Sequence, residues 1–154
     1  MSTEYDNIDR KILKCLQADG RMQNSDVADR VGISPATCHR RIQKLMESGI
    51  ISSIRAEINP HAVDRGTMVL VGVILERSTT ESFAEFEKAI TEFSFILDCS
   101  CVAGDFDYIL KIRSRDIADF NRLHREQLLT LPEVRQLRSF FVLKEVTNNA
   151  LLDF

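Results

Sequence analysis

The chain has 154 residues, which is enough for one domain or two small ones. Hydrophobic residues make up 44% and charged residues 28% of it, as in ordinary water-soluble globular proteins. No apolar run approaches the ~20 residues of a membrane-spanning helix, and the N-terminus lacks the cationic and apolar segments of a secretion signal. We therefore expect a cytoplasmic protein with no membrane partner.

The net charge of −3 does not by itself indicate a nucleic-acid partner. The distribution of charge is more informative, because residues 34–48 hold Arg40, Arg41 and Lys44 against Glu47 alone. A protein with this balance would bind DNA through a small cationic patch, and its affinity for DNA would fall steeply with salt.

Residues 6–18 predict a first helix, with Asp6 as its N-terminal cap and apolar residues on one face. A second, shorter helix is predicted to begin at Asn24 or Ser25 and to end at Gly32. A third capped helix follows directly. A short helix, a tight glycine-containing turn and a capped helix together form a helix-turn-helix unit.

The third helix is predicted to start at Ser34, whose hydroxyl caps it, with Pro35 in its first turn and Gly49 as its stop. One side is apolar, and the other carries small, hydroxylated and cationic residues that suit a DNA major groove. A solvated surface helix with no ligand is the alternative interpretation. The residues that we expect to contact DNA are Ser34, Ala36, Thr37, His39, Arg40, Arg41 and Lys44, with Arg40 the first choice for a base edge.

Residues 51–58 predict a strand that leaves this unit, and Asn59-Pro60 ends it. We assign residues 1–60 to a DNA-binding domain and residues 61–66 to a linker.

The second half of the chain alternates strands and helices in the order β-α-β-β-α-β, which is the ferredoxin-like arrangement. The fold class is therefore α+β, with this domain spanning 67–147 and a tail at 148–154 that is loose or latches onto a neighbour. The expected strands are 67–76, 95–102, 106–113 and 134–146, and the expected helices are 82–93 and 116–131, with Ile117 among the inward-facing residues.

Two of these strands, 67–76 and 134–146, are apolar on both faces. Helices cover only one face of a ferredoxin-like sheet, so the other face needs a cover as well. A second copy of the chain, packed sheet against sheet, is the simplest cover and predicts a dimer at least. The alternative is that the linker or the N-terminal domain covers this face.

The chain contains four cysteines, and Cys99 and Cys101 form a Cys-x-Cys pair in a predicted strand. This pair lacks a second ligand pair at zinc spacing, so we interpret both as small buried hydrophobic residues. We expect no metal and no cofactor.

The sequence resembles the Lrp/AsnC family of leucine-responsive and asparagine-responsive regulators over nearly its whole length. The resemblance implies a winged helix-turn-helix, a C-terminal domain that dimerises and binds amino acids, and assembly into tetramers, octamers or larger rings. It rests on residues 8–13, 19–21, 32–35, 40–41, 49–51, 59–60, 104–108 and 131–134.

Gly104-Asp105-Phe106-Asp107-Tyr108 is at least a hairpin turn, in which glycine supplies unusual backbone angles. A zwitterionic amino acid needs N–H donors for its carboxylate and oxygens for its ammonium, and this turn offers both. In the family the effector lies near this turn, between subunits. The resemblance thus implies an effector site at Gly104, Asp105 and Asp107, to which strand proximity adds Cys101 and Phe140.

The leading hypothesis is a sequence-specific, nucleoid-associated transcriptional regulator that binds double-stranded DNA and responds to an amino acid. An enzyme is the second hypothesis, since some relatives of this architecture act in tetrapyrrole decarboxylation, with His61 and His124 as the candidates here. Neither histidine has a clear partner in the sequence, so we expect no catalysis. The third hypothesis is an amino-acid sensor whose helix-turn-helix binds a protein.

Overall fold

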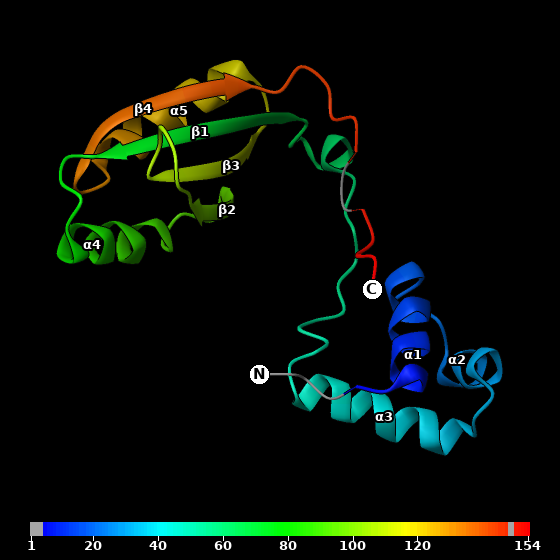
Figure 1. Ribbon diagram of the computed structural model, residues 1–154. Helices are drawn as coiled ribbons and strands as arrows, with labels where there is room; N and C mark the ends of the chain where they lie inside the picture. The colour runs from blue at the N-terminus through cyan, green and yellow to red at the C-terminus, as the bar shows by residue number, and fades with distance from the viewer. Residues whose placement is uncertain (1–4, 148–149) are drawn as a thin grey trace. The chain divides into compact units, whose positions relative to one another are not determined.

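The computed structural model describes residues 5–147 and 150–154 of the chain, which divides into two compact units (Figure 1). The first unit comprises residues 1–57 together with 147–154, and the second comprises 58–146. The predicted tail at 148–154 thus falls partly outside the described residues. Within the described residues, no helix is long and apolar enough to cross a lipid bilayer.

Three helices build the first unit: α1 (Asn7–Ala18), α2 (Asn24–Val31) and α3 (Pro35–Glu47) (Figure 1). Their apolar faces meet in one small core, as the sequence pattern predicted. The buried side chains of this core are Ile12, Val27, Ala28, Cys38, Ile42 and Leu45.

The strand predicted at 51–58 is wrong, because this segment pairs with no other strand among the described residues. A strand requires a neighbouring strand for its backbone N–H and C=O groups. Ile54 and Ile58, which favoured the prediction, remain exposed. The predicted linker contains a short 3₁₀ helix, η1 (Pro60–Val63), in which the Asn59 side chain accepts from the N–H of His61 at 3.0 Å.

The end of the chain packs on α1 within the first unit. The Gln17 side-chain Nε2 donates to the Leu152 carbonyl at 2.9 Å, and the Leu152 N–H donates back to the side-chain Oε1 of Gln17 at 3.0 Å. The Phe154 ring meets Tyr5 edge-on, with 6.5 Å between the ring centroids. These contacts fasten residues 150–154 to the helix-turn-helix unit.

The second unit contains a four-stranded antiparallel sheet in the order β2-β3-β1-β4, so the strand order and the chain order are those of a ferredoxin-like fold. The strands are β1 (Thr67–Leu75), β2 (Ile96–Cys101), β3 (Tyr108–Ser114) and β4 (Val134–Phe141). The helices are α4 (Thr80–Ile90), α5 (Ile117–Glu126) and the 3₁₀ turn η2 (Leu128–Thr130).

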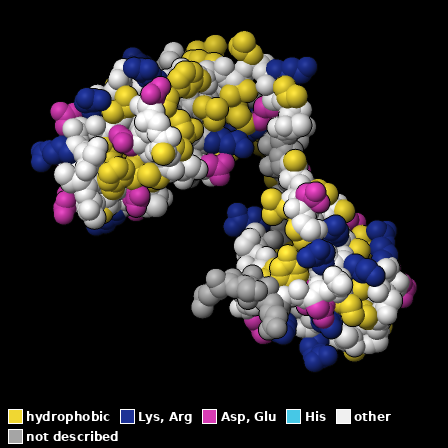
Figure 2. Space-filling model, viewed as in Figure 1, with side chains coloured by type: hydrophobic (Ala, Val, Ile, Leu, Met, Phe, Trp, Pro, Cys, Tyr) yellow, Lys and Arg dark blue, Asp and Glu magenta, His cyan; other side chains and the backbone are white. Residues whose placement is uncertain are grey.

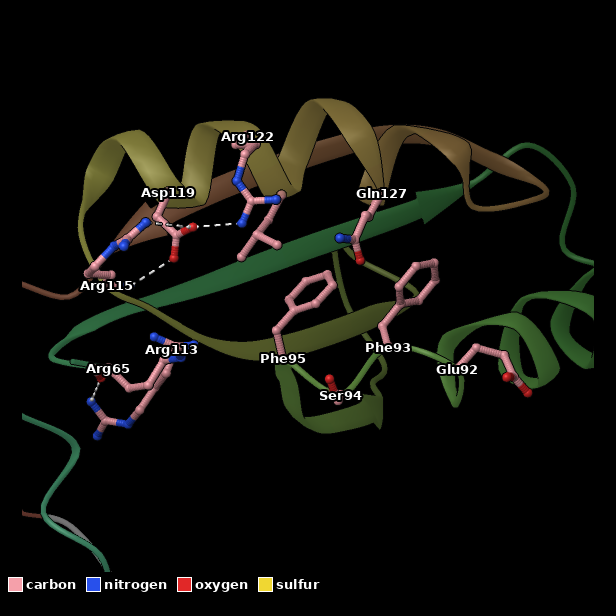
Figure 3. Close-up of a pocket in the computed structure, with 11 residues that line it drawn as sticks. Arg65, Glu92, Phe93, Ser94, Phe95, Arg113, Arg115, Asp119, Arg122 and Gln127 are labelled. Carbon is pink, nitrogen blue, oxygen red and sulfur yellow. Dashed lines mark hydrogen bonds and ion pairs between the residues drawn. The ribbon is translucent and has the colours of Figure 1, made fainter. Parts of the chain in front are cut away.

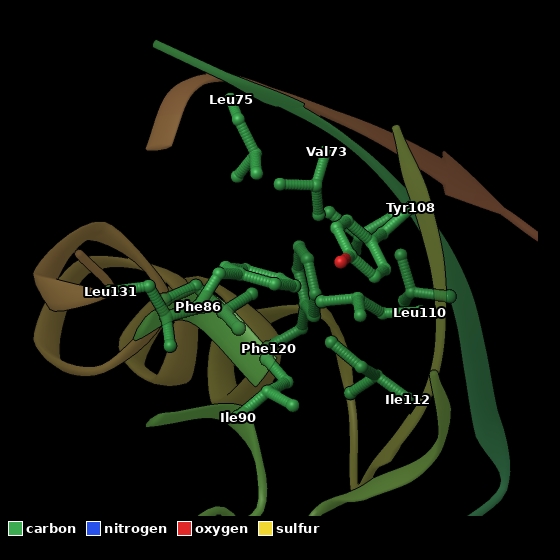
Figure 4. Close-up of a cluster of buried hydrophobic side chains, with 12 residues drawn as sticks. Val73, Leu75, Phe86, Ile90, Tyr108, Leu110, Ile112, Phe120 and Leu131 are labelled. Atoms are coloured by element: carbon green, nitrogen blue, oxygen red, sulfur yellow. The ribbon is translucent and has the colours of Figure 1, made fainter. Parts of the chain in front are cut away.

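One face of the sheet packs against α4 and α5 to form the main core (Figure 4). Alternate residues of β1, namely Val69, Val71, Val73 and Leu75, point into this core and are buried. The Tyr108 hydroxyl satisfies its polar end by donating to Glu87 at 2.7 Å, and burial together with this carboxylate raises the pKa of Tyr108. A buried hydroxyl thus joins β3 to α4 without an unpaired polar group.

The opposite face of the sheet, here called the open face, carries Met68, Leu70, Gly72 and Ile74 of β1, and Phe140 of β4 lies opposite Leu70. No helix of the second unit covers it, and Figure 2 shows hydrophobic side chains gathered over the sheet of this unit. Phe140 remains 49% exposed. The open face is therefore apolar around Leu70 and Phe140 and is not covered by a helix of its own unit, while Lys111 and Arg138 lie on the same face opposite Leu70 and Gly72.

Several details differ from the sequence expectations. The helix expected at 116–131 ends at Glu126, and the 3₁₀ turn η2 follows it. Cys99 and Cys101 are exposed, and β2, which carries them, is an edge strand of the sheet. Ile117 is also exposed, at the first turn of α5. The last strand ends at Phe141 and not at residue 146, although the Val142 N–H still donates to the Met68 carbonyl of β1 at 3.0 Å.

Candidate nucleic-acid interface and effector turn

The turn between α2 and α3 is set by two local features. Gly32 adopts a left-handed conformation with φ of +79°, which favours glycine and ends α2. Ser34 then caps α3 by accepting from the Thr37 N–H at 3.2 Å, and its hydroxyl donates to the Thr37 hydroxyl at 2.8 Å. Two predicted DNA-contact residues, Ser34 and Thr37, therefore also fix the start of α3.

The outer face of α3 presents Ala36, His39, Arg40 and Lys44, all exposed. His39 Nδ1 lies 3.0 Å from the side-chain amide of Asn24, so this ring is oriented from α2. Cys38, Ile42 and Leu45 hold the opposite face of α3 in the core. The arrangement projects two cationic side chains, Arg40 and Lys44, one turn apart on the same face of the helix.

Arg41 lies differently from its neighbours on α3. Its guanidinium donates to Asp6 at 2.9 Å and to Asp9 at 2.8 Å, both at the start of α1. Asp6 is at the same time the cap of α1, accepting from the N–H groups of Ile8 and Asp9. The charge of Arg41 is thus neutralised by two carboxylates and ties α3 to α1, an engagement that the linear sequence gave no means to foresee.

The predicted effector turn links β2 to β3, and Gly104 has a φ of +152° that few other residues adopt. Asp105 is exposed at the tip of the turn. The Asp107 carboxylate instead accepts from the Leu75 N–H at 2.8 Å, and the Asp107 N–H donates to the Val73 carbonyl at 2.9 Å. Asp107 therefore fixes the turn to the end of β1, and Asp105 is the carboxylate presented to solvent.

Phe106 connects this turn to the open face of the sheet. Its ring lies over Gly72, where an added Cβ would fall 2.5 Å from the ring atoms. The Phe106 and Phe140 ring centroids are 6.0 Å apart, and the Arg138 guanidinium lies 5.8 Å from the Phe106 centroid. The structure thus brings Phe140 to the turn through Phe106, whereas Cys101 is exposed on β2 opposite Tyr108.

Sequence reasoning missed Phe106, Gly72 and Arg138 as members of this group. The signal for Gly72 was available, because a glycine inside an apolar strand often marks a close approach of another group. Arg138 could be placed only once the register of β4 against β1 was known, since that register sets it opposite Gly72.

A helix-turn-helix unit joined to a ferredoxin-like domain defines a class of ligand-regulated DNA-binding proteins. Residues 5–52 match the model of the winged helix-turn-helix DNA-binding family, and residues 68–152 match the Lrp/AsnC ligand binding domain. The chain belongs to the Lrp/AsnC family of transcriptional regulators, and the enzyme alternative falls with this assignment.

Named relatives agree with this assignment. The leucine-responsive regulatory proteins of Klebsiella pneumoniae and Escherichia coli K12 are each 40% identical over 143 residues, which are 93% of this chain and 87% of theirs. Among solved structures, the transcriptional regulator NMB0573 of Neisseria meningitidis, in complex with L-Met, is 30% identical with a TM-score of 0.90. An AsnC family regulator of Agrobacterium tumefaciens gives the same two values, and the match covers 97% of both chains in each case.

The anchoring of α3 by Asp6 predicts an acid-sensitive DNA-binding unit. The N–H of Asp9, with Arg41, lowers the pKa of Asp6 below its ordinary value of 3.8. The contribution of Asp6 to the free energy of unfolding is therefore complete above pH 3.8. It is lost as the pH falls through the lower pKa that Asp6 has in the folded protein. We expect the melting temperature of this unit, followed by circular dichroism, to fall over that range.

Asp6→Asn is the matched variant, because asparagine still caps a helix but does not titrate. It should start with a lower melting temperature at neutral pH and lose less of it on acidification. Parallel acid profiles for the wild type and Asp6→Asn would contradict the role of this carboxylate.

Proposed function

We propose that this protein regulates transcription by inserting α3 of the helix-turn-helix into the major groove of duplex DNA, under control of an amino acid bound at the 104–107 turn. The observation that supports DNA binding is the difference between the cationic side chains of α3. Arg41 is engaged by Asp6 and Asp9, whereas Arg40 and Lys44 stand exposed on the outer face of the helix.

Arg40 is the residue proposed to contact a base edge, because a guanidinium pairs bidentately with guanine in the major groove. Lys44 supplies a phosphate contact one helical turn further along α3, and Ser34, Ala36, Thr37 and His39 complete the surface. Arg41 acts indirectly in this proposal, by holding α3 on α1.

The amino-acid proposal is supported by the chemistry of the turn and by the relative solved with L-Met. Gly104 leaves backbone N–H groups accessible to a carboxylate, and Asp105 offers a charge to an ammonium. Phe140, held beside the turn by Phe106, supplies an apolar wall for the side chain of the amino acid. Cys101 lies on the neighbouring strand as a further contact.

Self-association through the open face completes the proposal. An exposed apolar sheet face is costly in water and is covered economically by an identical face. Two chains paired in this way present two α3 helices to related half-sites, and effector binding shifts the balance between dimers and larger assemblies. In such a protein, cytoplasmic location and association with the nucleoid follow from DNA binding.

Arg40→Ala should weaken binding to a duplex selected from random sequence by about 1–3 kcal/mol, because a bidentate base contact is lost. A band-shift titration measures the effect. Arg77→Ala, an exposed arginine outside the DNA-binding unit, is the control and should leave the affinity unchanged. Equal affinities for Arg40→Ala and the wild type would remove Arg40 from the interface.

Asp105→Asn should abolish the thermal stabilisation by amino acids, because the ammonium loses its charged partner. A ligand at about 100 times its Kd stabilises the wild type by about 2.7 kcal/mol, which a thermal-shift screen with the twenty amino acids detects. Asp98→Asn removes the same charge from β2 and should keep the shift. A full shift in Asp105→Asn would exclude this carboxylate from the effector site.

Leu70→Glu should convert the assembly to monomers of 17.6 kDa, because it places a carboxylate at the centre of the open face. Light scattering after size-exclusion chromatography gives the mass directly. The control is Leu129→Glu, at an exposed leucine of η2, which should keep the wild-type mass. An unchanged mass in Leu70→Glu would show that another surface joins the chains.

A further inference from the structure

The second unit contains a cavity of about 350 Å³ between α5, the end of β3 and the loop before β2 (Figure 3). Four arginines line it, against two carboxylates, Glu92 and Asp119, and we call it the arginine cavity. The arginines are Arg65, Arg113, Arg115 and Arg122.

This cavity is separate from the effector turn. The turn precedes β3 at Tyr108, whereas the cavity lies at the other end of this strand, beside Arg113. Five residue steps along an extended strand place the two sites about 17 Å apart. An amino acid bound at the turn therefore does not fill the cavity.

The arginines are held in place by carboxylates that are partly outside the lining. Arg113 is buried and donates to Glu145 at 2.7 Å, and Arg122 donates to Asp119 at 2.8 Å. Arg115 lies 3.9 Å from Asp116 and 3.8 Å from Asp119.

Arg65 differs, because no carboxylate of residues 5–147 and 150–154 lies within ion-pair distance of it. Its guanidinium donates to the neighbouring Asp64 carbonyl at 2.7 Å. A guanidinium has five N–H donors in a planar fork, so this one bond leaves capacity for a ligand.

The two ends of the cavity differ in chemistry. Figure 3 shows Arg65, Arg113 and Arg115 toward one end, with Phe95 in the middle and Phe93 and Gln127 toward the other. The rings of Phe93 and Phe95 have centroids 5.7 Å apart and form an apolar wall. An occupant that fits both ends carries an anionic group at one end and an apolar body at the other.

We propose that the arginine cavity binds a small organic anion, in which a carboxylate or phosphate meets Arg65 and Arg115 and an apolar body lies against Phe93 and Phe95. Planar or tetrahedral oxyanions match the bidentate geometry of guanidinium groups. The volume suits a small molecule. A free amino acid binds poorly, because its ammonium lies one carbon from its carboxylate and would face the arginines, whereas Glu92 lies at the Phe93 end of the cavity (Figure 3).

Calorimetric titration of the full-length protein with phenyl phosphate, phenylacetate and phenylalanine tests this proposal, because the three share a ring and differ in charge. At least one of the two anions should bind, with an affinity that falls as salt rises. Binding of phenyl phosphate alone identifies a phosphate site, binding of phenylacetate alone identifies a carboxylate site, and both outcomes support the proposal.

Arg65→Gln and Arg115→Gln should each weaken anion binding about tenfold, since each removes charged hydrogen bonds. Arg125→Gln is the matched control, an exposed arginine of α5 outside the cavity lining, and should bind as the wild type does. Any heat from phenylalanine should persist in Arg65→Gln and Arg115→Gln.

The proposal is overturned if neither anion binds up to about 10 mM, which corresponds to less than 3 kcal/mol. It is also overturned if Arg125→Gln weakens binding as much as Arg65→Gln and Arg115→Gln do. If Arg65→Gln and Arg115→Gln weaken phenylalanine binding as strongly as they weaken anion binding, the claim that the cavity selects anions over amino acids is overturned.

Discussion

The second unit depends on an asymmetry in its sheet. Helices α4 and α5 cover one face, so Val69, Val71 and Val73 are buried there, while Leu70 and Phe140 lie on a face that no helix of this unit covers. Burial of apolar surface is the largest favourable contribution to association, so this open face favours a second chain as its cover. The proposed pairing of two reading helices, and an effector site placed where chains meet, both rest on this asymmetry.

The first unit holds α3 firmly in place while two of its cationic side chains, Arg40 and Lys44, stay exposed. The core residues Cys38, Ile42 and Leu45 fix one face of α3, and Arg41 fixes its side through Asp6 and Asp9. Asp6 both caps α1 and pairs with Arg41, so one carboxylate fixes the start of α1 and the position of α3. Arg40 and Lys44 are exposed to solvent and are therefore available to a polyanion such as DNA.

Local chemistry made much of this fold predictable from the sequence. The caps Asp6 and Ser34, the left-handed Gly32 and the alternation of strands and helices act over a few residues, and these features were confirmed. The prediction of a strand at 51–58 was wrong, because strand formation depends on a pairing partner elsewhere in the chain, which the local sequence does not reveal. The prediction that Cys99 and Cys101 are buried was wrong, because the position of β2 at the edge of the sheet decides their exposure more than their hydrophobicity does. The ion pairs of Arg41 join residues more than thirty positions apart and required the packed structure.

The most direct test of the central claim is a hydroxyl-radical footprint of the wild-type protein on a duplex selected from random sequence. In the proposed dimer, two chains joined through their open faces would present two α3 helices to one side of the duplex. The account predicts two protected segments whose centres are separated by whole helical turns, about 10–10.5 base pairs each. A single protected segment at saturating protein, bound by one chain, would contradict it.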